Sequence, residues 1–264
     1  MTRKIPKQSP TAAERCGDER PIRAGLLPDV LFRHRSSLVL LLVMPIAAAV
    51  FTGAQVERLQ AVVGVLLVGL GAGLRLASAR VIGRGARVHR ADLRGELATA
   101  GPYRWSRNPL YVAAGLIIAG LGLHAGCGWP ALILLPATLF VYTPIVWHEE
   151  SALTAAGGES YLRYRGRVWR WIGPPAPPDG GFAEIARRAP WSEVLRRERF
   201  LIPGMICAVA GLTLVRTGRI PLGDSLEGLA PGTRAEVLGP ILVGLGMVGN
   251  SMAIVLKRRR PRHS

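Results

Sequence analysis

The stretch Gly101-Pro102-Tyr103-Arg104-Trp105-Ser106-Arg107-Asn108-Pro109-Leu110-Tyr111 separates an arginine-rich segment from a long apolar one. The apolar run opens at Pro109, and proline fits the first turn of a helix because its missing N–H would have no partner there. The stretch therefore predicts a loop that ends where a helix enters a membrane. It brings two tyrosines, two arginines, a tryptophan and an asparagine to that boundary. We expect the other segments to be arranged around it.

The composition is typical of a membrane protein. Of the 264 residues, 49% are hydrophobic, yet the formal net charge is +17. A soluble domain rarely combines the two, whereas in a membrane protein the apolar spans and the basic loops are separate populations. A nucleic-acid-binding protein would also be basic. Here, however, the arginines cluster at the ends of apolar runs and not in one stripe with interleaved aromatics. We therefore expect membrane lipid, and no nucleic acid, as a partner.

The apolar runs predict an all-α, polytopic helical membrane protein with about six transmembrane helices. The expected spans are residues 37–53, 59–79, 109–124, 129–147, 200–215 and 237–256. If the N-terminus is inside, nearly all Lys and Arg fall in cytoplasmic segments, which is the positive-inside pattern. Both termini are then cytoplasmic. The Arg-, Gly- and Ala-rich composition suggests a bacterial source, so the expected location is the bacterial inner membrane.

The spans divide the chain into four parts. The lead, residues 1–36, is basic and expected to be disordered. Residues 37–173 form a membrane core of four spans and an amphipathic interfacial helix from Glu159 to Trp171. A Pro/Gly linker and a basic amphipathic segment occupy residues 174–199. The remaining residues, 200–264, are expected to form a two-span extension with a basic tail.

The second predicted span is rich in glycine. Gly64, Gly69, Gly71 and Gly73 predict close contact with another helix, and Gly69 with Gly73 forms a GxxxG pattern. In a glycine-rich chain, ordinary packing inside the protein explains this pattern better than a dimer interface does.

Two polar groups are expected to meet on the predicted cytoplasmic face. The third and fourth spans are joined by a tight turn, so they should be antiparallel neighbours. Their cytoplasmic ends then lie close together, which places Glu149 and Glu150 beside Arg107, Asn108 and Tyr111. Adjacent carboxylates at the end of a span are costly unless they are solvated, paired or used. The ordinary alternative is an exposed pair that merely ends the helix.

Carboxylates, arginines, aromatic faces and a helix N-terminus together suit a zwitterionic ligand. Arginine and the helix N-terminus favour a carboxylate, glutamate favours an ammonium, and aromatic rings favour a sulfonium. The same aromatic residues would also suit the aromatic belt of a membrane protein. No nucleotide-binding glycine loop or HExxH motif is present, and Cys16, Cys127 and Cys207 have no metal-ligand or disulfide spacing.

Three motifs in register resemble the isoprenylcysteine carboxyl methyltransferase family and the wider group of phospholipid methyltransferases. They are residues 101–111, Glu149-Glu150-x-x-Leu153, and Tyr161-x-x-Tyr164-x-x-Arg167-Val168-x-Arg170-Trp171-Ile172. The resemblance covers about residues 75–174. It implies an integral membrane enzyme that binds S-adenosyl-L-methionine at the cytoplasmic face without a Rossmann domain. It also implies a lipophilic small-molecule or lipid acceptor that enters from the bilayer.

The resemblance further implies which residues form the site. If the acceptor is an amine, Glu149 or Glu150 is the candidate catalytic base. The implied cofactor contacts are Tyr103, Arg107, Asn108, Tyr111, Glu150, Tyr164, Arg167 and Arg170. No metal is expected.

Asn108 stands where the family motif usually has histidine, and Ala113 stands where it often has glycine. Asparagine can donate and accept hydrogen bonds but does not titrate near neutral pH. A cofactor-contacting role therefore survives the change, whereas a proton-transfer role does not.

The sequence leaves two function classes and several acceptors open. The alternative to an enzyme is a small transporter or lipid-binding scaffold in which the Glu/Arg cluster is structural. Charges at the ends of spans, not at their middle, argue against transport. The acceptor could be a prenylated cysteine carboxylate, a phospholipid amine, an isoprenoid or quinone-like hydroxyl, or a small thiol. The sequence does not define the oligomeric state.

Overall fold

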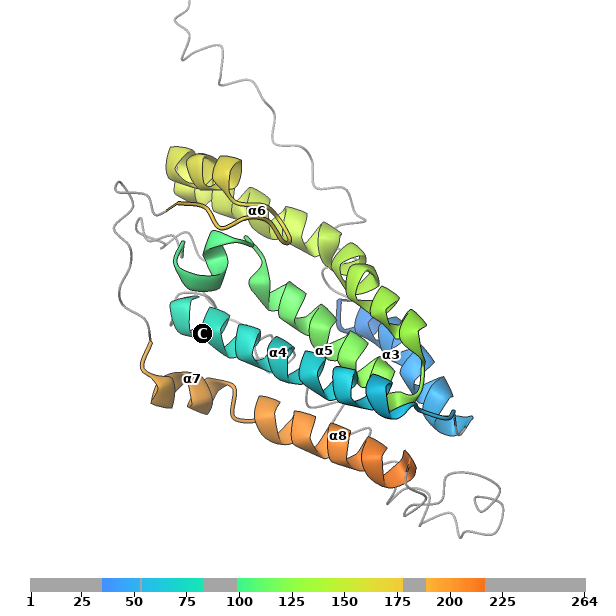
Figure 1. The fold of residues 1–264 in the computed structure, drawn as a ribbon. Helices are drawn as coiled ribbons and strands as arrows, with labels where there is room; N and C mark the ends of the chain where they lie inside the picture. Colours follow the sequence, from blue (N-terminus) through green and yellow to red (C-terminus); the bar gives the residue numbers. More distant parts are fainter. Residues whose placement is uncertain (1–34, 53, 83–98, 178–188, 217–264) are drawn as a thin grey trace, which may run out of the picture.

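The computed structural model describes four stretches of the chain, residues 35–52, 54–82, 99–177 and 189–216. Every regular element in these stretches is a helix, which confirms the all-α prediction for them (Figure 1). The α-helices are α3 (Arg35–Phe51), α4 (Arg58–Ile82), α5 (Pro109–Ala125), α6 (Leu134–Arg167), α7 (Trp191–Arg197) and α8 (Leu201–Arg216). Two 3-10 helices precede α5 and α6: η2 (Gly101–Arg104) and η3 (Trp129–Ile133).

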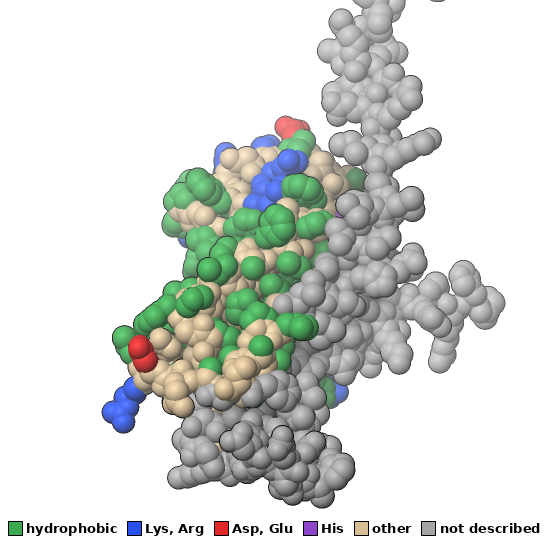
Figure 2. All heavy atoms as spheres, turned by 90° about the vertical axis from the view of Figure 1, so that its right-hand side faces the viewer, with side chains coloured by type: hydrophobic (Ala, Val, Ile, Leu, Met, Phe, Trp, Pro, Cys, Tyr) green, Lys and Arg blue, Asp and Glu red, His purple; other side chains and the backbone are tan. Residues whose placement is uncertain are grey.

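Two helical stretches are long and apolar enough to cross a membrane, Arg58–Ile82 and Trp129–Ala155. Helices α5 and α8 are apolar but shorter. Large hydrophobic side chains such as Leu66 of α4 and Phe140 of α6 are exposed, as expected of a surface that faces lipid. Figure 2 shows hydrophobic side chains across the middle of one face, with charged side chains toward its ends. The sixth predicted span, 237–256, lies outside the described residues, and the six-span topology stays a prediction.

Helix α5 is the centre of the bundle and contacts α3, α4, α6 and α8 (Figure 1). It approaches α4 so closely that a Cβ added at Gly64 would lie 2.6 Å from the Gly120 oxygen, and the reverse is also true. Gly71 has a similar contact with α5, but a Cβ at Gly69 or Gly73 would meet open space. The predicted close contact of α4 therefore depends on Gly64 and Gly71, and the GxxxG pair does not take part in it.

The main hydrophobic core joins α3, α4, α5 and α8 through buried residues such as Ile46, Val68, Ile117 and Met205. Helix α8 is thus packed into the same core as the helices that precede it in the chain. At the far end of α5 from Pro109, the buried His124 adds a polar contact, with Nε2 3.0 Å from Oγ1 of Thr213 in α8.

Helix α6 is longer than the fourth predicted span, which was expected to end at Trp147. It continues through Glu149 and Glu150 and is interrupted only by a kink at Gly158, where φ is 51°, a backbone conformation that glycine adopts readily. The two glutamates therefore project from a continuous helix. Because an α-helix has 3.6 residues per turn, neighbouring side chains point about 100° apart. Glu149 and Glu150 consequently reach different surroundings.

The predicted interfacial helix Glu159–Trp171 is the last part of α6 and is shorter than expected. It ends at Arg167 because the next residue is extended (φ −109°, ψ 132°). Tyr161 and Tyr164 share a buried cluster, as their helical spacing predicts. Trp171 leaves that helical face and packs instead against the hydrophobic cluster between α5 and α6.

Candidate functional site

Two segments far apart in the sequence are joined by backbone hydrogen bonds. The loop before α5 lies antiparallel to the chain that follows α6, and three amide groups connect them. These bonds run from Arg107 N–H to the Trp169 oxygen (2.9 Å), from Gly173 N–H to the Trp105 oxygen (2.9 Å) and from Ala176 N–H to the Arg104 oxygen (2.8 Å). The hydroxyl of Tyr164 also donates to the backbone oxygen of Tyr103 (2.8 Å). The first and third sequence motifs thus form one structural unit.

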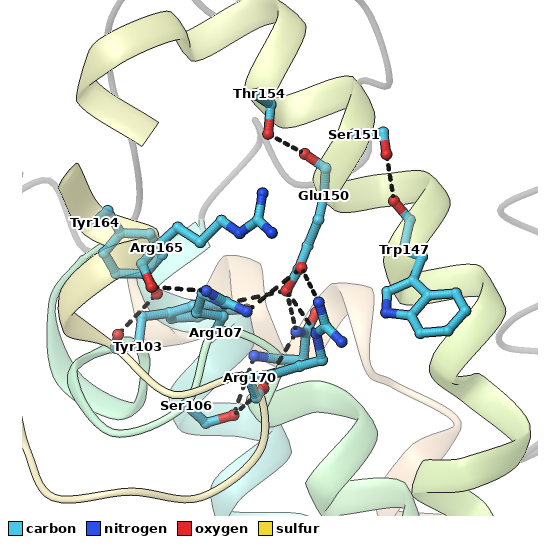
Figure 3. A network of polar contacts seen from close by, with 11 residues as sticks. Tyr103, Ser106, Arg107, Trp147, Glu150, Ser151, Thr154, Tyr164, Arg165 and Arg170 are labelled. Atoms are coloured by element: carbon cyan, nitrogen blue, oxygen red, sulfur yellow. Dashed lines mark hydrogen bonds and ion pairs between the residues drawn. The ribbon is translucent and has the colours of Figure 1, made fainter. Parts of the chain in front are cut away.

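The carboxylate of Glu150 is the centre of this unit (Figure 3). Only 5% of the residue is exposed. Arg170 donates from Nη2 to Oε2 (2.9 Å) and from Nε to Oε1 (3.4 Å). Arg107 Nε lies 3.0 Å from Oε1, and Asn108 Nδ2 donates to the same oxygen at 3.4 Å. Two guanidinium groups around one carboxylate give the cluster a net positive charge.

Arg107 is fixed between the two segments but retains an unused donor. Its Nη1 donates to the backbone oxygen of Arg165 at 2.8 Å, and its side chain is 8% exposed. Although Nε is close to Glu150, its N–H is not aimed at an acceptor, so it is a buried donor without a hydrogen bond. A buried, unsatisfied donor costs about 1–3 kcal/mol. The ion pair with Glu150, at 3.0 Å, offsets part of that cost, and a ligand acceptor aligned with this N–H, such as a carboxylate, would recover the rest.

Asn108 is the N-cap residue of α5, yet its side chain does not cap the helix. Its Nδ2 donates to the backbone oxygen of Arg170 (3.2 Å) as well as to Glu150. Its backbone N–H donates to Oγ of Ser106 (3.0 Å). The residue at the atypical position of the motif therefore acts as a hydrogen-bond donor that joins the loop to the rest of the cluster.

Glu149 is bound by a different donor. The hydroxyl of Tyr111 donates to both of its carboxylate oxygens, at 3.1 Å and 3.2 Å. The ring of Tyr111 is in turn fixed by Tyr142 of α6, with ring centroids 4.6 Å apart. Because Tyr111 is in the first turn of α5, this contact fixes Glu149 relative to that helix.

The tyrosines near the glutamates are protonated hydrogen-bond donors at physiological pH. Burial raises the pKa of Tyr103 well above its usual value of 10.0, and Tyr164 and Glu149 raise it further. Burial, with a smaller contribution from Glu150, raises the pKa of Tyr161 to about 12. The pKa of Tyr164 is raised mainly by burial as well. These phenols can therefore bind an anion or an oxygen acceptor without adding charge.

The structure brings most of the predicted site residues together, although their cofactor contacts stay a prediction. The residues within this unit are Tyr103, Arg107, Asn108, Tyr111, Glu149, Glu150, Tyr164 and Arg170. Arg167 is exposed at the end of α6.

Sequence reasoning did not assign Ser106, Tyr142 or Trp147 to the site. From the sequence, Trp147 was expected to belong to the aromatic belt. In the structure, its ring centroid lies 5.8 Å from Cζ of Arg170. Its position three residues before Glu150, which is one helical turn, is the signal that could have placed it there. Ser106 accepts from Asn108 two residues later, a local pattern of serine before a helix.

A family model described as phospholipid methyltransferase matches residues 59–158. The matched stretch contains the first two motifs and ends before the third, and it confirms the resemblance inferred from the sequence. No curated protein and no solved structure matches the chain. Since the family is one of membrane-associated methyltransferases, the match supports methyltransferase activity at a membrane.

Proposed function

We propose that the protein is an S-adenosyl-L-methionine-dependent membrane methyltransferase. The match of residues 59–158 to the phospholipid methyltransferase family supports this proposal. The protein transfers a methyl group to a lipophilic or amphiphilic acceptor at the face that the basic residues predict to be cytoplasmic. The setting we propose is the inner membrane of a bacterium.

The observation that carries this proposal is the buried cluster around Glu150. Two arginines, an asparagine and a glutamate from three segments converge there, where burying charge is expensive unless the charges are paired or used. The net positive charge and the unused N–H of Arg107 suit the carboxylate end of an amino-acid cofactor. The residues present therefore fit S-adenosyl-L-methionine, which when bound supplies an electrophilic methyl group on a sulfonium.

The two adjacent glutamates have separate roles in this proposal. Glu150 is the counter-ion that holds Arg107 and Arg170 in place, and its oxygens are occupied by their donors. Glu149 is less buried, and its carboxylate is held by the Tyr111 hydroxyl. If the acceptor carries a proton, as an ammonium or hydroxyl group does, Glu149 is the residue that accepts it. A methyl transfer otherwise requires mainly alignment and the exclusion of water.

The acceptor class follows from the charge of Glu149. A carboxylate beside this side chain would suffer like-charge repulsion, whereas an amine would be attracted and could pass its proton to it. An amphiphile with an amine head group is therefore the acceptor that we favour, with a hydroxyl second.

The direct test is binding and turnover by the detergent-purified protein. We expect heat of binding, and a higher Tm, on addition of S-adenosyl-L-methionine, and transfer of labelled methyl groups from it into an extracted lipid fraction. Absence of binding by folded protein at millimolar cofactor would reject the proposal. It would favour the rival class, a transporter or scaffold in which the same ion pairs are structural. Labelling of a lipid with a free amine but not of its acetylated form would support the acceptor class.

A further inference from the structure

Helices α7 and α8 lie outside the segment that matches the family, yet they are fixed to it by polar contacts as well as by the core. The backbone N–H of Ala189 donates to the oxygen of Arg80 (3.0 Å), and Arg80 Nε donates back to the Ala189 oxygen (3.4 Å). The Arg80 guanidinium also lies over the ring of Trp191, 4.4 Å from its centroid. We call residues 189–216 the C-terminal unit. These contacts fix its position on α4.

The C-terminal unit also supplies the partner of a charge inside α4. Nε of Arg75 donates to Oε2 of Glu198 at 3.0 Å. Their side chains are 18% and 8% exposed, respectively. Arg75 is about two helical turns before the end of α4, a stretch apolar enough to span a membrane. A largely buried charge in such a place is destabilising unless it is paired. Glu198 neutralises it.

Arg75 is close enough to the candidate site to act on it. Leu74, the neighbour of Arg75 on α4, packs against the hydrophobic cluster that contains Tyr111, and α4 also packs against η2, which carries Tyr103. Burial, Tyr164 and Glu149 raise the pKa of Tyr103, and the positive charge of Arg75 makes a smaller, opposite contribution. A change in the charge of Arg75 therefore changes the electrostatic potential at the proposed cofactor site. The sign of that charge is important because the sulfonium of S-adenosyl-L-methionine is positive.

We propose that Glu198 is a positioning residue of the methyltransferase site: it pairs with Arg75 and so cancels a positive charge next to η2 and its Tyr103. The C-terminal unit, which the family match does not include, thereby contributes to the electrostatics of the candidate site. This inference rests on the proposed function. It concerns the charge that the site presents to a cationic ligand, and not only the attachment of α7 and α8.

The test compares two ligands that differ in one charge, S-adenosyl-L-methionine and its demethylated product S-adenosyl-L-homocysteine, a neutral thioether at sulfur. The full-length protein is titrated with each by calorimetry. In Glu198→Gln, we expect the Kd of the sulfonium ligand to rise about three- to tenfold through repulsion by Arg75, while the Kd of the thioether changes less than about twofold. A purely structural role would weaken both ligands equally.

Two further variants test the same inference without relying on Glu198→Gln alone. Arg75→Gln removes the positive charge itself and should change the ratio of the two Kd values in the opposite direction, in favour of the sulfonium. The double variant Arg75→Gln/Glu198→Gln should restore the wild-type ratio. The matched control is Glu193→Gln, which removes a carboxylate of α7 that pairs with Arg197 of the same helix. It should leave the ratio unchanged.

The outcomes separate this inference from the proposed function. If the wild-type protein binds both ligands and the ratio is the same in Glu198→Gln and Arg75→Gln, the inference is wrong and the function stands. If the folded wild-type protein binds neither ligand, the proposed function fails and the inference fails with it. Should Glu198→Gln not fold, the shift expected in Arg75→Gln decides the matter alone.

Discussion

Two buried glutamates, Glu150 of α6 and Glu198 between α7 and α8, each bind an arginine from another segment. Glu150 receives contacts from two arginines and an asparagine, and it lies inside the segment that matches the family. Glu198 pairs with Nε of Arg75 and lies outside that segment. The comparison teaches that burial alone does not decide what a carboxylate contributes. Which donors depend on it, and whether a ligand uses those donors, decides its role.

The largest effect is expected for Glu150→Gln. This variant leaves Arg107 and Arg170 without their shared counter-ion, and the free energy of unfolding should fall by about 3–5 kcal/mol. Cofactor affinity should fall by more than about 100-fold, because the arginines no longer have a fixed geometry. Chemical denaturation and calorimetry in detergent measure the two quantities. Glu159→Gln, an exposed position on the same helix, is the control. If Glu150→Gln were no worse than Glu198→Gln, the contrast between the two glutamates would be wrong.

Asn108→Asp is expected to rank second. It replaces the amide that donates to Glu150 and to the Arg170 oxygen with a carboxylate that repels both. Loss of a hydrogen bond to a charged group costs about 1.5–3 kcal/mol, so stability and cofactor affinity should both fall. Asn108→His, which restores the residue usual in the family motif, keeps one donor and should stay within about threefold of wild-type affinity. A loss of rate at acidic pH, near the usual pKa of histidine, that appears only in Asn108→His would indicate that the histidine has gained a role as proton acceptor.

The sequence predicted correctly that Glu150 lies close to Arg107. Pro109 marks the start of α5, and the tight turn between the third and fourth spans makes α5 and α6 neighbours. Together these two features place Glu150 against Arg107. Helical spacing also predicted the buried pair Tyr161 and Tyr164. These predictions were correct because they depend on local backbone conformation and on a tight turn. A tight turn forces the two helices that it joins to be antiparallel neighbours.

Other features could not be read from the sequence because they depend on contacts between distant segments. The helix after Gly158 ends at Arg167 because the following residues form hydrogen bonds with the loop at 104–107, and a helical pattern does not reveal that competition. Similarly, nothing in the spacing of Arg75 and Glu198 indicates that they meet. Their pairing follows from the packing of α7 and α8 on α4, which depends on the whole core.

A smaller effect on stability is expected when lysine replaces the arginine of each ion pair, Arg170–Glu150 and Arg75–Glu198. Arg170 uses two nitrogens on Glu150, whereas Arg75 uses one on Glu198. Lysine has no planar fork and cannot replace two parallel donors. Arg170→Lys should therefore cost about 1–2 kcal/mol more than the loss from Arg75→Lys, the difference being the second charged hydrogen bond. Thermal unfolding of both variants measures it, with Arg163→Lys at an exposed position as the control. Equal losses would indicate that Arg170 acts as a point charge.

The smallest effect is expected for Tyr111→Phe, which concerns Glu149 and leaves the donors of Glu150 intact. The variant removes the hydroxyl that binds both oxygens of Glu149 but keeps the ring that packs on Tyr142. Cofactor Kd should stay within about twofold of wild type, while kcat falls about three- to tenfold because the proton acceptor is less well oriented. Titration calorimetry and initial rates give the two numbers, and Tyr161→Phe is the matched phenol removal on α6. If Kd and kcat changed together, Glu149 and Glu150 would belong to one binding unit, and the division of roles between adjacent carboxylates would have to be abandoned.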